Sequence, residues 1–182
     1  MNTIVWTSAL IVFSLCKADA MLGLLFGLSV SISVLFTAFL IIITEKHADE
    51  KVRLFWVTVF SICMGTAFSR CFGSAFSGEA DNFFSVVSGI ASSIVSFICF
   101  HVKSTSVGNI LKNVLPIVPI SFGIGALREV FGEGSIFGEE IKPVSEYTVS
   151  SLGAYCGGLL ISAVFIGISL IVCKRLGGKN GA

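Results

Sequence analysis

Long runs of apolar residues, separated by short polar stretches, dominate the chain. Six such runs can be marked between the charged positions: Thr3–Cys16, Met21–Thr44, Leu54–Phe72, Phe83–Phe100, Ile110–Leu127 and Ser151–Cys173. Most approach the roughly 20 apolar residues that an α-helix needs to cross a bilayer. The pattern predicts an all-α, polytopic membrane protein whose six transmembrane segments fill residues 1–182 as a single domain.

Two of the runs differ from a simple spanning helix. Thr3–Cys16 has only about 14 residues, fewer than the roughly 20 that a spanning helix needs. Ile110–Leu127 contains Lys112, Pro116 and Pro119. Proline removes a backbone hydrogen bond and clashes with the preceding turn, so we expect a kinked or late-starting helix there.

Basic and acidic residues alternate between successive loops. Lysine and arginine gather in Glu45–Arg53, at Lys103 and in the tail after Cys173, whereas the intervening loops carry aspartate and glutamate. Short basic loops stay in the cytoplasm. Both termini are therefore expected on the cytoplasmic side, as an even number of crossings requires.

The composition agrees with a membrane protein. Hydrophobic residues make up 54% of the chain and charged residues 13%, and the mean hydropathy is +0.95. A soluble domain needs roughly twice that charge to cover its surface. The net charge of +1, without a basic cluster, excludes nucleic acid as a partner. The six cysteines lie in or beside apolar runs, so a disulfide framework is not expected.

The six runs divide into two sets of three, the pseudo-repeats 3–75 and 83–175. The first run of each set carries a cysteine near its C-terminal end, at Cys16 and Cys99. Because three crossings is an odd number, the second set would run inverted relative to the first. Inverted repeats with broken first helices form their sites near the membrane midplane. This predicts short or broken first and fourth helices, with Cys16 and Cys99 converging near the bilayer centre.

One segment resembles a known family. Gly125–Gly138 reads GALREVFGEGSIFG, which is similar to the pattern G-A-I-R-E-I-L-G-x-G-T-L-F-G of the E subunit of Rnf electron-transport complexes, and to the D subunit of the sodium-translocating NADH:quinone reductase. Residues 89–99 align without gaps on the family's G-I-F-I-P-L-I-V-T-N-C, the surroundings of Cys16 resemble its L-G-L-C-P element, and Ser151–Lys174 fits its last helix. Lys17 replaces the family's proline, and Phe97-Ile98 replaces its Thr-Asn.

The resemblance implies a function. In that family, two paralogous six-helix subunits pair, and each supplies two cysteines to a shared [2Fe-2S] cluster. By matched position, Cys16 and Cys99 would bind the iron here, with Cys71 as the reserve candidate. The chain would be a subunit, not catalytic alone, of a redox-driven translocase in the bacterial inner membrane. It would relay electrons, coupled to Na+ or H+ movement, together with the paralogous subunit and the rest of the complex.

Other functions remain open. A small solute or vitamin transporter component without a redox cofactor also has six spans, and the 17 phenylalanines are compatible with it. A third alternative is a scaffold subunit that has lost its cluster. Arg128 and Glu129, where a span meets an acidic loop, fit ion coupling, subunit docking or interfacial anchoring. The chain has no Ser/His/Asp set, paired catalytic carboxylates or metal-type histidine spacing, so we predict no hydrolytic or transferase activity.

Overall fold

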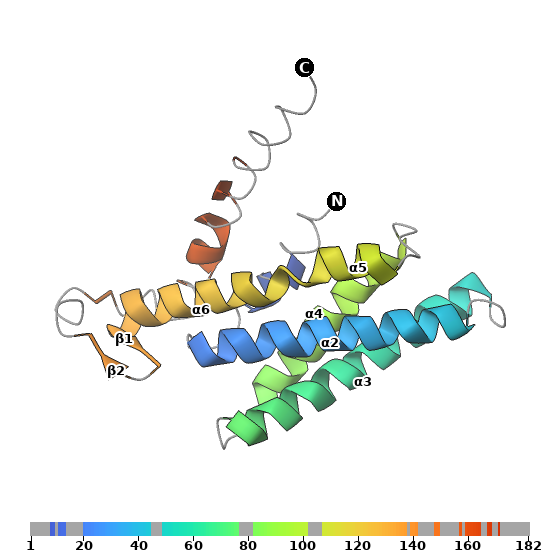
Figure 1. Ribbon diagram of the computed structural model, residues 1–182, viewed down its shortest axis with the longest axis horizontal. Helices are drawn as coiled ribbons and strands as arrows, with labels where there is room; N and C mark the ends of the chain where they lie inside the picture. The colour runs from blue at the N-terminus through green and yellow to red at the C-terminus, as the bar shows by residue number, and fades with distance from the viewer. Residues whose placement is uncertain are drawn as a thin grey trace.

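The computed structural model of the chain is a bundle of helices with a small hairpin at one end (Figure 1). It describes residues 8–9, 11–13, 20–44, 49–76, 82–101, 107–137, 139–141, 148–149, 157, 159–164, 167–168 and 171. The helices are α2 (Ala20–Thr44), α3 (Glu50–Phe76), α4 (Asn82–His101), α5 (Val107–Val114) and α6 (Ile117–Glu133). The hairpin consists of β1 (Ser135–Ile136) and β2 (Glu139–Glu140), which pair antiparallel.

Four segments of the described chain are long and apolar enough to cross a membrane. They are Ala20–Ile43, Lys51–Ser74, Asn82–Phe100 and Ile110–Glu133, and they correspond to the four middle runs of the sequence pattern. The first and last predicted spans fall largely outside the described residues. The total of six spans and the inverted repeat therefore stay predictions.

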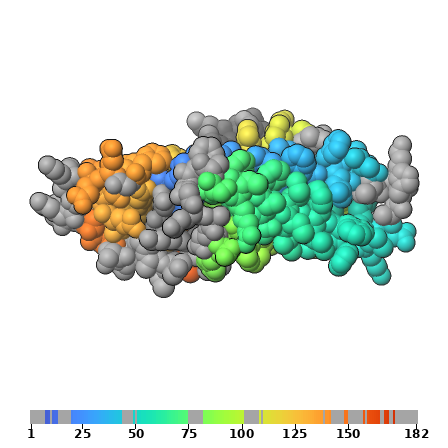
Figure 2. Space-filling view, turned by 90° about the horizontal axis from the view of Figure 1, so that it is seen from below, coloured from blue at the N-terminus to red at the C-terminus, as the bar shows by residue number. Residues whose placement is uncertain are grey.

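The four spans run alternately up and down the bundle. In Figure 1, α2 lies between the interrupted rod formed by α5 and α6 on one side and α3 on the other, with α4 crossing behind. Figure 2 shows α3 and α4 forming much of one face, with the end of α6 and the hairpin at one extremity.

Of the two interruptions predicted for the described helices, one is present and one is not. A short or broken fourth helix was predicted, but α4 is continuous over 20 residues. It contains no proline, so no backbone donor is missing. The interruption lies instead at Leu115–Pro116, between α5 and α6, which confirms the kink predicted for the run that contains Pro116 and Pro119.

Neighbouring groups compensate for the interrupted hydrogen bonds. Pro119 has no N–H, so the Leu115 carbonyl accepts a bond from Val118 N at 3.3 Å in place of its regular helical donor. The Ser31 hydroxyl of α2 donates to the carbonyl of Val114 at 3.4 Å. A broken helix is tolerated at membrane depth when a neighbouring helix satisfies the freed groups in this way.

Glycines bring the helices into close contact. A Cβ built with ideal geometry on Gly23 would lie 2.5 Å from the carbonyl oxygen of Ser121, and one on Gly27 would lie 2.6 Å from the Cα of Val118. Gly65 allows a similar close approach between α3 and α4, because a Cβ built on it would lie 2.9 Å from the Cα of Gly89. Small residues four positions apart are a common way for membrane helices to approach closely.

Replacing Gly27 by alanine should therefore push α2 and α6 apart. We expect Gly27→Ala to lower the free energy of unfolding in detergent by about 1–3 kcal/mol, the usual cost of overpacking. Gly123→Ala is the matched control, because nothing lies within 4 Å of its added Cβ; the higher helix propensity of alanine should raise stability by up to about 1 kcal/mol. Equal effects of the two variants would contradict the close contact.

Candidate functional site

The segment that begins at Gly125 occupies the C-terminal half of α6 and continues into β1. Its buried residues include Gly125, Arg128, Glu129 and Gly132, which recur every three or four positions along one face of the helix. Gly134 ends the helix with a left-handed φ of 69°, and its N–H donates to the Val130 carbonyl at 3.0 Å. Glycine adopts this conformation without steric cost.

The carboxylate of Glu129 joins the end of α6 to the beginning of α2. Its Oε2 accepts a hydrogen bond from the backbone N of Ala20 at 2.9 Å, and its Oε1 accepts one from the Ser135 hydroxyl at 3.4 Å. Ala20 is the first residue of α2, where backbone N–H groups have no helical partner. A negative charge is also favourable at a helix N-terminus. Glu129 therefore caps α2.

Arg128 and Glu129 are both interior residues. Arg128 is 0% exposed and Glu129 is 3% exposed, although both lie in the span Ile110–Glu133. Interfacial anchoring stays a prediction for both residues, because burial within the protein does not fix their depth in a membrane. Charged groups inside a membrane segment are costly and are usually retained for a structural or functional role. Ion coupling and subunit docking both remain compatible with this position.

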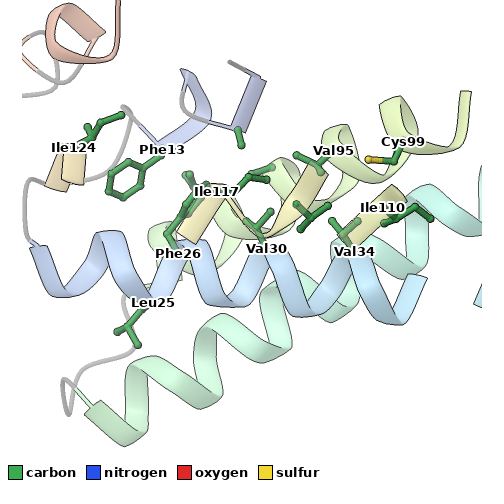
Figure 3. Packing of buried hydrophobic residues seen from close by; sticks show 14 of the residues in the cluster. Phe13, Leu25, Phe26, Val30, Val34, Val95, Cys99, Ile110, Ile117 and Ile124 are labelled. Carbon is green, nitrogen blue, oxygen red and sulfur yellow. The ribbon is translucent and has the colours of Figure 1, made fainter. Parts of the chain in front are cut away.

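Cys99 is a buried, free thiol in the last turn of α4. It is 3% exposed and forms no disulfide. Figure 3 shows it beside Val95 and Ile110 within the apolar cluster, while Phe13 and Phe26 lie toward the other end. Cys99 is next to the end of the candidate span Asn82–Phe100, and its predicted place near the bilayer centre stays a prediction. The end position follows from the continuity of α4.

The second predicted iron ligand, Cys16, lies outside the described residues, and so do Cys156 and Cys173. Whether Cys16 meets Cys99 stays a prediction. Within the described part of the chain, no group of three or more His, Cys, Asp or Glu side chains could hold a metal ion. Cys63 and the reserve candidate Cys71 are exposed on α3.

A set of buried hydroxyls was not anticipated from the sequence. Ser29 and Ser88 share a hydrogen bond of 2.7 Å between α2 and α4, and Thr37 and Ser61 share one of 2.9 Å between α2 and α3. The signal that could have revealed them is serine or threonine repeated every four residues inside apolar runs. That spacing places the hydroxyls on one helix face.

We expect removal of the Glu129 carboxylate to loosen the contact between α6 and α2. Glu129→Ala should lower the free energy of unfolding in detergent by about 1.5–3 kcal/mol, the range for a hydrogen bond to a charged group. Glu133→Ala, one turn later at an exposed position, is the control and should have little effect. A Glu129→Ala variant as stable as the control would show that the cap contributes nothing.

Comparisons of the chain with protein-family models, with curated proteins and with solved structures find no match. The function is therefore inferred from the residues and contacts of this chain.

Proposed function

We propose that the chain is a membrane subunit of an ion-translocating oxidoreductase complex, relaying electrons across the membrane together with a paralogous subunit. The observation that carries the proposal is the set of contacts and conformations adopted by residues of the segment Gly125–Gly138. Positions that it shares with the E-subunit pattern have defined roles in this bundle. Arg128 is buried, Glu129 caps α2, and Gly134 adopts the left-handed cap of α6.

A departure from the pattern supports the same conclusion. Ser135 stands where the family pattern has threonine. Its hydroxyl lies 3.4 Å from Glu129 Oε1, and threonine would present the same group. The position therefore keeps its chemistry while its residue type changes, as expected for a divergent member with the same local structure.

Cys99 is the described residue that fits as a ligand of a [2Fe-2S] cluster. It forms no disulfide, is buried and belongs to a candidate spanning helix, and cluster irons are held by cysteine thiolates. We propose that Cys99 and Cys16 supply two of the four thiolates and that the paralogous subunit supplies the others. When bound, the cluster would provide an intermediate electron carrier between the two faces of a hydrocarbon layer about 30 Å thick.

The broken helix supports the ion-translocating part of the proposal. Discontinuous membrane helices supply backbone carbonyls to Na+ or H+ pathways in transporters. In this chain the α5–α6 break lies beside Ser31, near the middle of α2. We propose the bacterial inner membrane as the location, with the basic segment Glu45–Arg53 on the cytoplasmic side.

The decisive measurement is iron and acid-labile sulfide in the complex purified with this chain. We expect Cys99→Ser to abolish or strongly reduce the visible absorbance and the electron paramagnetic resonance signal of a [2Fe-2S] cluster. Cys63→Ser is the matched control, because Cys63 is also a membrane-helix thiol but is exposed on α3. The control should retain the signal.

Two outcomes would overturn the proposal. An iron-free complex that retains a small organic ligand would favour the transporter component. Iron that persists unchanged in Cys99→Ser would remove Cys99 from the ligand set. In both cases, the amount of each variant in the membrane has to match that of the unmodified chain.

A further inference from the structure

Buried hydroxyl groups recur along α2, α3 and α4, and we call this set the seam. The seam consists of Ser29, Ser33 and Thr37 of α2, Ser61 and Ser69 of α3, and Ser88, Ser92 and Ser96 of α4, all of them buried. Each helix contributes its hydroxyls at intervals of four or eight residues. At 1.5 Å per residue, the part between Ser29 and Thr37 is roughly 12 Å long.

Hydrogen bonds fix the register of the three helices. Ser29 pairs with Ser88, and Thr37 pairs with Ser61. Ser33 also donates to the backbone carbonyl of Ser61 at 3.1 Å. Because α2 and α4 run in the same direction and α3 runs in the opposite one, Ser69 lies at the level of the first pair. Ser96 lies at the level of the second.

Two hydroxyls in the seam have no partner. Ser69 is 1% exposed and Ser96 is 2% exposed, and among the described residues neither Oγ makes a hydrogen bond. Ser92, by contrast, donates to the Ser88 carbonyl of its own helix at 2.8 Å. A buried polar group without a partner is destabilising. In natural proteins, ordered water commonly fills this role.

The two ends of the seam differ. At the Ser29 end lie packed aromatic rings, with 4.9 Å between the centroids of Phe13 and Phe26 and 6.4 Å between those of Phe26 and Phe84. At the other end, the Arg53 guanidinium lies over the Phe100 ring, 4.9 Å from its centroid. The buried Arg53 Nε has no hydrogen-bond partner among the described residues. A water molecule would accept a hydrogen bond from this N–H.

We propose that the seam binds water at Ser69, Ser96 and Arg53, and that these waters join the hydroxyls into a hydrogen-bonded chain open toward Arg53. Water is the ligand class, since the site offers hydroxyls and one N–H but no carboxylate. Such a chain passes a proton by successive transfer, each oxygen accepting one proton and releasing another, so no bond to carbon changes.

The seam also runs close to the candidate iron ligand. Cys99 follows Ser96 by three residues, which places both on the same face of α4. If the chain relays electrons as proposed above, the proton route passes within one helical turn of the electron-carrying sulfur. This link rests on the proposed function; the presence of water in the seam does not.

Cysteine accessibility tests the proposal in membranes that contain the full chain. Ser96→Cys, Ser69→Cys and Val95→Cys would each be exposed to a membrane-impermeant methanethiosulfonate added at the Arg53 side, and labelling would be followed by peptide mass spectrometry. Val95 is the matched control, because it is equally buried one residue from Ser96 but belongs to the apolar cluster. Thiolates form readily only where water is present.

We expect Ser96→Cys to react about tenfold or more faster than Val95→Cys. Ser69→Cys should react more slowly than Ser96→Cys but faster than the control, because it lies further from the open end. Rates at both seam positions that equal the Val95→Cys rate would overturn the proposal. Serine and cysteine are similar in size, so these variants should retain the fold.

A second measurement gives an independent answer. If Ser96 binds water, Ser96→Ala removes a satisfied hydroxyl and should lower the thermal transition of the detergent-solubilised chain. If the hydroxyl has no partner, the same change removes an unfavourable group, and the transition should stay the same or rise. A dry seam is thus recognisable even where labelling fails. Iron content is a separate readout, so loss of the cluster would leave this test intact.

Discussion

Polar groups inside a lipid-embedded bundle have to find partners within the protein, and this constraint accounts for most of the features of this chain. The break at Pro116 frees backbone carbonyls, and Ser31 supplies a donor to one of them. The N-terminus of α2 exposes N–H groups, and Glu129 accepts from the first. In each case the partner comes from a different helix. Polar satisfaction therefore determines which helices must be neighbours.

These bonds depend on short distances between helix backbones, which glycine makes possible. Serine is a short side chain, so two serines on facing helices bond only when the helices lie close together. Gly65 and Gly89 bring α3 against α4, and Gly23 and Gly27 bring α2 against α6. The same glycines leave little room for other side chains. The apolar cluster around Phe26 and Val34 then fills the spaces that remain between the helices.

Much of the helical pattern could be predicted from the sequence, because hydrophobicity is a property of each segment alone. The four middle runs agree with observed spans, and Pro116 and Pro119 correctly predicted an interruption. The extension of α6 to Glu133 was missed, since Arg128 and Glu129 were placed at the boundary of a span. Their burial depends on the start of α2, more than 100 residues away in the chain.

The serine pairs were missed for a similar reason. Each is formed by residues at least 24 positions apart, and serine in an apolar run carries no signal of its partner.

The position of Cys99 connects the two halves of the functional proposal. If Cys99 binds the proposed cluster, the cluster lies beside the C-terminal end of α4. The polar seam extends from that level toward the middle of the bundle, past Ser96 and Ser92. The deeper part of α4 thus offers polar groups for an ion and no thiol for an electron. In the proposed function, electron transfer and ion movement would then take place at different levels of the same helix. Any shift of α4 that changes the surroundings of the Cys99 sulfur also shifts the hydroxyls, which gives a physical basis for coupling electron transfer to ion movement.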